Sequence, residues 1–285
     1  MAVQIITDST SYIDETLRAS LGINVVSLNV LFDNDNFREV NLKNDTFYEM
    51  MEKRGIPTSS QPSVEEIYTC MENIIKKGDE ILCVFLSSSM SGTYSTAHMV
   101  KEMILEKYVN AKIEIVDSRS NSMQLGFAAI VAARAAKDGQ SLEEVKTITL
   151  ENTRRSRFLF IPDNLVYLKK GGRIGGASAL IGNILKIIPI LTVEDGKTSI
   201  ANKIRTKRRA KLEMADMFLN DVNKFGLGEV AIHHINCIDE AKDLALILKQ
   251  SLNVQVPICD IGPVIGLHVG PGAIGIAYYT KNPLR

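Results

Sequence analysis

Strand-like and helix-like segments alternate through the first half of this chain, and that alternation restricts the fold more than any other feature. Short apolar segments typical of strands lie at Ala2–Thr7, Ile23–Phe32, Glu80–Leu86 and Lys112–Asp117. Helical patterns lie at Asp14–Leu21, Asp45–Lys53, Ser63–Lys77, Ser91–Glu106, Ser122–Lys137 and Ser141–Asn152. This order favours a parallel sheet covered by helices on both faces. Sheets of that kind bind ligands at the carboxyl ends of their strands, so the polar turns there are the first candidates for a site.

The pattern changes near Ser156. Short strands are expected at Phe158–Ile161, Pro189–Val193, Thr198–Arg205, Glu229–Ile235 and Val254–Asp260, with helices at Arg208–Lys224 and Asp239–Ser251. Glu194–Lys197 has the composition of a hairpin turn between two of these strands. We therefore expect an α/β protein of two domains: a parallel-sheet domain over residues 1–155 and a smaller mixed α+β domain over residues 156–285.

Charge and cysteine usage exclude several classes of protein. The 33 Lys and Arg residues balance 33 Asp and Glu residues, so no global field attracts nucleic acid or anionic membrane. No apolar segment approaches membrane-spanning length, and the N-terminus begins with a strand pattern rather than a basic leader. The four cysteines are Cys70, Cys83, Cys237 and Cys259, and no two of them have the CxxC spacing of a metal or redox site. We expect a cytoplasmic protein with free thiols, no metal, no cofactor and no integral membrane association.

The segment Pro57–Ser63 carries four hydroxyls and one amide between two prolines, directly before a predicted helix. Ser63, with Glu66 three residues later, has the pattern of a capping box. One hydroxyl suffices for a cap, whereas a set of neutral donors beside a helix N-terminus suits an anion. Both interpretations of Ser59 and Ser60 stay open on these residues alone.

A second serine-rich turn, Ser87–Tyr94, follows a predicted buried strand and leads into a helix. Ser91 and Gly92 can present a hydroxyl and a backbone N–H to the same ligand oxygen. The turn is not the G-x-S-x-G elbow of serine hydrolases, because Ser89 and Thr93 occupy its glycine positions. The strand-to-helix context favours a binding role over a plain helix cap.

Near the C-terminus, Gly262–Gly275 places five glycines and two prolines around one histidine, His268. Core strands avoid this composition, so close approach to the backbone is expected, with His268 as the titratable group at that place. Gly270, Gly272 and Gly275 match the dinucleotide fingerprint formally. The match is spurious because too few residues follow for a βαβ unit.

Cations gather in two segments. Arg173 stands among the glycines of Lys169–Gly176, where it suits a second anion contact, a domain-closing pair or the surface of a helix end. Six cations occupy Asn202–Lys211, which suits either a solvated helix start or a docking surface for an acidic protein partner. The docking candidates are Lys203, Arg205, Lys207, Arg208 and Arg209.

The apolar segment Ala179–Ile188 suits either a tunnel wall or ordinary core packing.

Seven motifs in order along the chain resemble those of the DegV family, which includes the fatty-acid-binding subunits (FakB) of bacterial fatty acid kinases. The motifs are Thr7–Ser11, Thr58–Ser63, Leu86–Tyr94, Val116–Ser118, Tyr167–Ile174, Lys203–Lys207 and Gly262–Gly272. The resemblance runs almost from end to end. It implies two domains with one long-chain fatty acid, such as palmitate, in a buried tunnel between them.

The resemblance also implies roles for residues. Ser59 or Ser60, Ser91 with Gly92, and His268 would bind the carboxylate, and Arg173 would lie near the same end. A separate ATP-dependent fatty acid kinase would phosphorylate that carboxylate for lipid metabolism, so the chain itself would be a non-catalytic carrier. Departures from the family pattern at Ser59, at Ser89–Met90 and at Leu267 bear on acyl-chain preference rather than on acid binding.

Two alternatives belong to other classes of protein. A serine-dependent acyl hydrolase or acyltransferase would use Ser91 and His268, but the sequence shows no third member of a triad. A nucleic-acid regulator would use Lys203–Lys211, but the net charge is zero and no motif that recognises bases is present. The carrier hypothesis is the one that the sequence favours.

Overall fold

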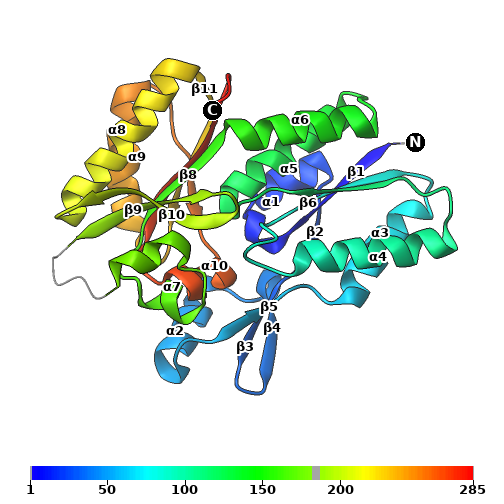
Figure 1. Cartoon of the computed structure of the whole chain (residues 1–285), viewed down its shortest axis with the longest axis horizontal. Coiled ribbons are helices and arrows are strands. Elements are labelled where there is room, and N and C mark those ends of the chain that lie inside the picture. The colour runs from blue at the N-terminus through cyan, green and yellow to red at the C-terminus, as the bar shows by residue number, and fades with distance from the viewer. Residues whose placement is uncertain (1, 182–186, 285) are drawn as a thin grey trace. The chain divides into compact units, whose positions relative to one another are not determined.

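The computed structural model of the chain describes residues 2–181 and 187–284 (Figure 1). The chain divides into two compact units. The first unit comprises Met1–Asn41 and Ser59–Arg154, and the second comprises Leu42–Thr58 and Arg155–Arg285. In this division the short segment Leu42–Thr58 groups with the C-terminal residues, and the expected boundary between residues 155 and 156 stays a prediction.

The first unit is built on a parallel sheet with the strand order β2-β1-β6-β7. Its strands are β1 (Val3–Asp8), β2 (Asn24–Val26), β6 (Glu80–Phe85) and β7 (Ile113–Asp117). The helices are α1 (Glu15–Leu21), α3 (Val64–Ile75), α4 (Thr93–Lys107), α5 (Ser122–Lys137) and α6 (Leu142–Arg155). Short 3₁₀ turns lie at Ser9–Ser11 and Glu39–Asn41. The predicted parallel sheet is confirmed.

Strand β6 explains why this sheet has helices on both faces. Ile81, Cys83 and Phe85 are fully buried in a core shared with α3 and α4. Leu82 and Val84 point to the opposite face and are equally buried, and α5 packs against β1 and β6. A strand with five successive buried apolar residues, Ile81 to Phe85, requires cover on both sides, which α3, α4 and α5 provide (Figure 1).

Two strand predictions were wrong. Of the predicted strand Val254–Asp260, only Ile258–Asp260 forms a strand. The segment Ile23–Phe32 forms two strands, because β2 ends at Val26 and β3 (Asn29–Phe32) joins a separate sheet. That small sheet has the order β4-β3-β5, with β4 at Asp35–Arg38 and β5 at Thr58–Ser60. At the break, the backbone N–H of Ser27 donates to the Glu66 carboxylate and that of Leu28 to the Ser9 hydroxyl. Side chains thus replace the strand partner over two residues.

The second unit contains a mixed sheet with the strand order β10-β9-β8-β13-β11-β12. Its strands are β8 (Ser156–Ile161), β9 (Ile188–Glu194), β10 (Lys197–Ile204), β11 (Leu227–His234), β12 (Ile258–Asp260) and β13 (Ile274–Thr280). Neighbouring strands are antiparallel except β11 and β12. The predicted hairpin is confirmed, since Lys197 pairs with Glu194 while Asp195 and Gly196 both have positive φ, as in a type I′ turn.

Helices α8 (Lys207–Phe225) and α9 (Ile238–Leu252) pack against this sheet. They contribute Met214, Phe218 and Leu244 to a core that includes Ile276 of β13. The remaining helices are α2 (Asn44–Arg54), α7 (Val166–Lys170) and α10 (Pro263–Val269), with a 3₁₀ helix at Gly175–Leu180. Over residues 2–181 and 187–284, the helices all lack the combination of length and apolar character needed to cross a membrane.

Candidate ligand-binding site

Carboxylates tie together the strand ends at the carboxyl edge of the first unit's parallel sheet. Asp8, the last residue of β1, accepts hydrogen bonds from the backbone N–H groups of Thr10 and Leu86, at 3.0 and 2.8 Å. Burial raises the pKa of Asp8 to about 6. Asp117, the last residue of β7, accepts a hydrogen bond from the Ser88 hydroxyl at 2.6 Å. These acids hold the loops in place, so the binding candidates are the neutral groups that the loops present.

Ser59 and Ser60 lie on the short strand β5 and are half-buried. Successive side chains on a strand point to opposite faces, so the two hydroxyls face different sides of β5. Binding of a headgroup by either Ser59 or Ser60 stays a prediction.

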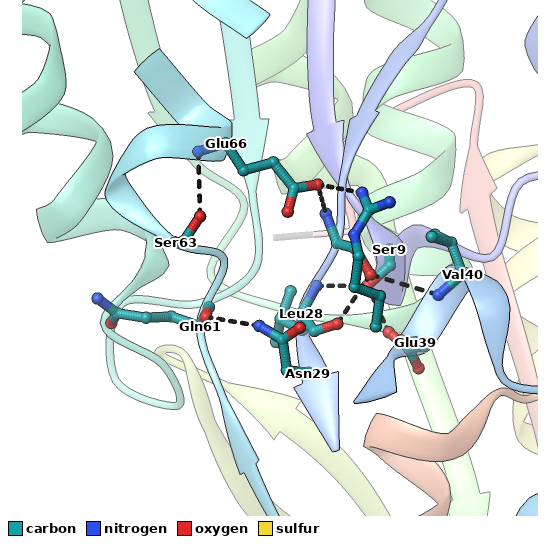
Figure 2. Close-up of polar contacts among 10 residues, drawn as sticks. Ser9, Leu28, Asn29, Glu39, Val40, Gln61, Ser63 and Glu66 are labelled. Atoms are coloured by element: carbon teal, nitrogen blue, oxygen red, sulfur yellow. Dashed lines mark hydrogen bonds and ion pairs between the residues drawn. The ribbon is translucent and has the colours of Figure 1, made fainter. Parts of the chain in front are cut away.

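The segment that follows β5 is held by the hairpin β3–β4, as Figure 2 shows. The Asn29 side chain donates to the backbone carbonyl of Gln61 at 3.4 Å. Ser63 caps α3, because its hydroxyl accepts from the backbone N–H of Glu66 at 3.0 Å. The predicted capping box is only half right: the Glu66 carboxylate accepts from the Ser27 N–H at 2.8 Å and pairs with Arg38 instead of returning to Ser63.

The Ser87–Tyr94 turn places Ser91 just before α4, which begins two residues later than predicted. The Ser91 hydroxyl accepts from the backbone N–H of Thr93 at 3.3 Å and lies 3.0 Å from the Thr93 hydroxyl. The N-cap of α4 is Gly92, so Ser91 contacts the first N–H of the helix from the residue before the cap and is not itself the capping residue. A serine hydroxyl has one proton and two lone pairs, so these contacts leave capacity for a ligand.

The two hydroxyl-bearing segments of the first unit meet at Gln61 and Gly92. The Gln61 amide nitrogen donates to the Thr96 hydroxyl on α4. A Cβ atom on Gly92 would lie 2.0 Å from the Gln61 side-chain oxygen, so the two residues are in close contact. The structure thus brings the Ser59–Ser60 segment beside the Ser91–Gly92 turn. Sequence reasoning noted the amide in this segment but gave Gln61 no role.

In the second unit, His268 lies on the short helix α10 and is half-buried. Burial and, to a smaller extent, the positive charge of Arg173 together lower the pKa of His268 to about 4. The imidazole is therefore neutral near pH 7, with one N–H donor and one acceptor nitrogen.

The two glycine-rich motifs of the second unit pack against each other. A Cβ atom on Gly171 would lie 2.2 Å from Nδ1 of His268, and one on Gly270 would lie 2.3 Å from the ring of Tyr167. A Cβ atom on Gly266 would lie 2.5 Å from the Tyr48 hydroxyl. The close approach expected at this backbone is thus made, at Gly266 and Gly270, by the protein's own tyrosines. Gly171 was not singled out from the sequence, and its signal was its place beside Arg173 in the glycine motif.

The predicted cations differ in their surroundings. Arg173 is exposed, and its guanidinium donates to the backbone carbonyl of Gly171 at 2.6 Å. The cations that are exposed on or before α8 are Lys203, Arg205, Arg208 and Arg209. Lys207 is different, because its ammonium pairs with Glu240 at 2.8 Å and donates to the carbonyl of Gly272 at 3.1 Å. Lys207 therefore links α8 to α9 and to the segment after α10.

The apolar segment expected as a tunnel wall lies partly outside the described residues, at 182–186. Of the flanking residues, Ile181 is 41% exposed. A cavity of about 340 Å³ in the second unit is lined by Leu180 and Ile181, which precede residues 182–186, and by Ile187, which follows them. Leu165 and Val166 also line it. Apolar surface is therefore present at both ends of the predicted wall.

Metal binding and disulfide formation find no support in the described ranges. The residues from 2 to 181 and from 187 to 284 include no cluster of three or more His, Cys, Asp or Glu side chains that could hold an ion. Cys70, Cys83, Cys237 and Cys259 are free thiols. His233 and His234 are successive residues of β11, as predicted, and burial lowers the pKa of His233 to about 3.

Known proteins resemble the chain over its whole length. A family model described as "Uncharacterised protein, DegV family" matches residues 2–281. A DegV domain-containing protein of Clostridium acetobutylicum is 65% identical over 285 residues, which cover 100% of both chains. The crystal structure of DegV from Bacillus subtilis, described as a fatty acid binding protein, has 33% identity and a TM-score of 0.89, covering 99% of this chain and 100% of that one.

A second solved structure shows the same fold. It is a DegV family protein from Thermus thermophilus, described by its fatty acid binding. It has 27% identity and a TM-score of 0.85, covering 98% of this chain and 100% of the other. The α/β architecture that the sequence predicts is therefore the architecture of these proteins.

Proposed function

Because the chain belongs to the DegV family, we propose that it binds one long-chain fatty acid, such as palmitate, and presents the carboxylate to a partner fatty acid kinase. The observation that carries the proposal is the set of neutral polar groups that both units present at their motifs. The chain is also similar, over 99% of its length, to the fatty acid binding protein of Bacillus subtilis. In this proposal the carboxylate contacts the hydroxyl of Ser59 or Ser60, the Ser91–Gly92 turn and His268.

The chemistry of these groups suits an acid that must react later. Hydroxyls, a backbone N–H and a neutral imidazole donate hydrogen bonds to the carboxylate but do not neutralise its negative charge. A bidentate arginine would engage both oxygens and reduce their nucleophilicity. Arg173 donates from one guanidinium nitrogen to Gly171, and its charge adds to the burial that keeps His268 neutral. A carboxylate bound by neutral donors retains an oxygen that can attack phosphorus.

Most of the affinity in this proposal comes from the acyl chain. Burying a methylene contributes about 0.8 kcal/mol, so a sixteen-carbon acid gains on the order of 10 kcal/mol before ordering costs. Each hydrogen bond from the polar groups to the charged carboxylate contributes about 1.5 kcal/mol. They therefore select the headgroup and orient it, while apolar surface supplies the binding free energy.

Transfer of the phosphoryl group belongs, in this proposal, to the kinase. A carboxylate oxygen attacks the γ-phosphorus of ATP, the bond from that phosphorus to the bridging oxygen breaks, and acyl phosphate and ADP result. The exposed cations Lys203, Arg205, Arg208 and Arg209 are proposed to steer an acidic face of the kinase, with Lys207 holding their segment in place. The chain itself is proposed to be a cytoplasmic, non-catalytic carrier.

The test begins with the ligand. An organic extract of the purified protein is expected to contain a long-chain acid by mass spectrometry, and delipidated protein is expected to bind palmitate. Ser91→Ala and His268→Ala are expected to weaken palmitate binding by about tenfold each, the equivalent of one hydrogen bond to a charged group. Ser95→Ala, at an exposed position on the same helix α4, and His98→Ala are the matched controls.

Two results would overturn the proposal. One is a protein that yields no fatty acid and shows no palmitate binding after delipidation. The other is hydrolysis of a chromogenic acyl ester that disappears in Ser91→Ala, which would instead identify a serine-dependent hydrolase.

A further inference from the structure

Gln61 contacts strand β3 and two residues at the start of helix α4 in the first unit. Its backbone carbonyl accepts from the Asn29 side chain on β3, at 3.4 Å. Its amide nitrogen donates to the Thr96 hydroxyl, which is buried on α4. Its amide oxygen lies over Gly92, at the start of that helix. Pro62 follows it and favours an extended backbone at Gln61. Gln61 is therefore held at its backbone carbonyl and at its side-chain amide.

Gly92 is required here for space and not for backbone conformation. Its φ and ψ of −75° and −3° are accessible to any residue. An added Cβ atom would lie 2.0 Å from the Gln61 side-chain oxygen and 3.1 Å from its Cδ. Because Gly92 has no side chain, the Gln61 amide can occupy the space that a Cβ atom would fill.

This contact sets the spacing of the two hydroxyl segments, because Ser60 directly precedes Gln61 and Ser91 directly precedes Gly92. We propose that Gln61 is a positioning residue for the fatty-acid carboxylate, which holds the Ser59–Ser60 segment at a set distance from the Ser91 hydroxyl through its contacts with Gly92 and Thr96. This inference rests on the proposed function, since it assigns a cause to the geometry of that site.

The physical effect is preorganisation. A headgroup that meets two hydroxyls already in place loses less free energy to ordering than one that must bring a loose segment into position. Without the amide contact, the short strand β5 keeps its backbone pairing with β3, while the turn after it loses its contacts with α4. Affinity for the acid falls, and burial of the acyl chain is unaffected.

The experiment compares hexadecanoate with hexadecan-1-ol, which has the same chain and needs only one hydrogen bond to its head. Gln61→Ala is expected to weaken hexadecanoate binding by about tenfold and hexadecanol binding by less than about twofold. Thr96→Val, which keeps the volume of the side chain and removes the acceptor, is expected to act in the same direction. Gln140→Ala, at an exposed position of the first unit, is the matched control.

A double variant tests the contact directly. Gly92→Ala alone is expected to weaken hexadecanoate binding, because the new Cβ displaces the amide. In the Gln61→Ala background the same substitution is expected to have no further effect, because the space is already empty. Additive losses in the double variant would overturn the proposal, as would equal losses for acid and alcohol in Gln61→Ala.

Failure of this inference is distinguishable from failure of the proposed function. Wild-type protein that binds no hexadecanoate overturns both. Binding that is weakened by Ser91→Ala and unchanged by Gln61→Ala and Thr96→Val overturns the positioning role alone. Thermal unfolding of each variant shows whether a lost affinity reflects a misfolded first unit, and a folded Thr96→Val that keeps wild-type affinity also overturns the role.

Discussion

In the first unit, Gly92 leaves room for the amide of Gln61, and in the second unit, Gly171 leaves room for the imidazole of His268. Both glycines have ordinary backbone angles, with φ of −75° and −76°. The side chains that they accommodate differ, because an amide does not titrate and an imidazole does. The first unit offers groups whose protonation is constant, whereas the second offers an imidazole that burial, with the charge of Arg173, keeps neutral below pH 6.5 as well.

The buried ionisable groups extend this contrast. In the first unit, burial raises the pKa of Asp8 to about 6 from its ordinary 3.8. In the second, burial lowers the pKa of His268 to about 4 and that of His233 to about 3, from 6.5. All three shifts disfavour the charged form, but acids and bases are charged on opposite sides of their pKa. The two units therefore respond to pH in opposite directions.

The largest expected effect is that of acidification. Each lowered histidine pKa contributes stability that is present above pH 6.5 and is lost as pH falls towards 4 for His268 and towards 3 for His233. From pH 7.5 to pH 5 the second unit is expected to lose about 2 kcal/mol per histidine. The raised pKa of Asp8 contributes stability that is present below pH 3.8 and is lost as pH rises through about 6. The first unit is expected to gain about 1 kcal/mol over the same change.

Hydrogen exchange, corrected for the intrinsic pH dependence, measures this difference in β11 and β6. Protection of β11 is expected to fall at pH 5, and protection of β6 is expected to hold or rise. Asp8→Asn should remove the gain in the first unit without changing the response of the second. Equal responses of the two strands would show that the contrast is wrong.

The next prediction tests whether His268 needs the space that the missing side chain of Gly171 leaves. Gly171→Ala puts a Cβ 2.2 Å from Nδ1 of His268 and 3.3 Å from the Tyr167 carbonyl. Overpacking of this kind costs about 2 kcal/mol of stability, and a rigid imidazole moves aside less easily than the amide of Gln61, whose side chain has more rotatable bonds. Gly171→Ala is therefore expected to lower the unfolding temperature more than Gly92→Ala and to weaken palmitate binding as much as His268→Ala.

Gly176→Ala is the control for Gly171→Ala, because its Cβ would make only ordinary contacts, at 3.6 Å and beyond. Calorimetry and palmitate titration measure both variants. If Gly171→Ala kept full affinity, His268 would not depend on this space.

The smallest effect separates Lys207 from its exposed neighbours. Lys207→Ala leaves Glu240 paired only with Lys211, at 3.1 Å, and is expected to cost about 0.5–1 kcal/mol in thermal unfolding, as for a partly exposed pair. Arg209→Ala, on an exposed position of the same helix turn, is expected to leave stability unchanged. A salt-independent loss in Lys207→Ala would count against the ion pair as its cause.

Local patterns predicted the elements well where the responsible residues are close in sequence. Most strand and helix positions followed from apolar spacing, and the Glu194–Lys197 hairpin followed from two turn residues. The failures have distant causes. Ile23–Phe32 is divided because Ser9 and Glu66 bond to its backbone, and Glu66 leaves the capping box for the same contact.

The candidate site divides in the same way. Its hydroxyls, glycines and histidine stand in motifs that the sequence displays, and the family resemblance assigned them to a fatty acid. The partner of each glycine lies far along the chain: Gln61 contacts the helix that Gly92 begins, and His268 meets Gly171. Such contacts leave no periodic or compositional trace.

By itself, the sequence determined the parallel sheet, the hairpin and the motifs that carry the polar groups, because propensity and hydrophobic spacing act over a few residues. Only the tertiary structure decided which groups face each other: Gln61 over Gly92, His268 over Gly171, and Lys207 between α9 and Gly272. It also decided the ionisation of Asp8 and His268, because a pKa depends on burial. Burial is a property of the packed chain and of no single segment.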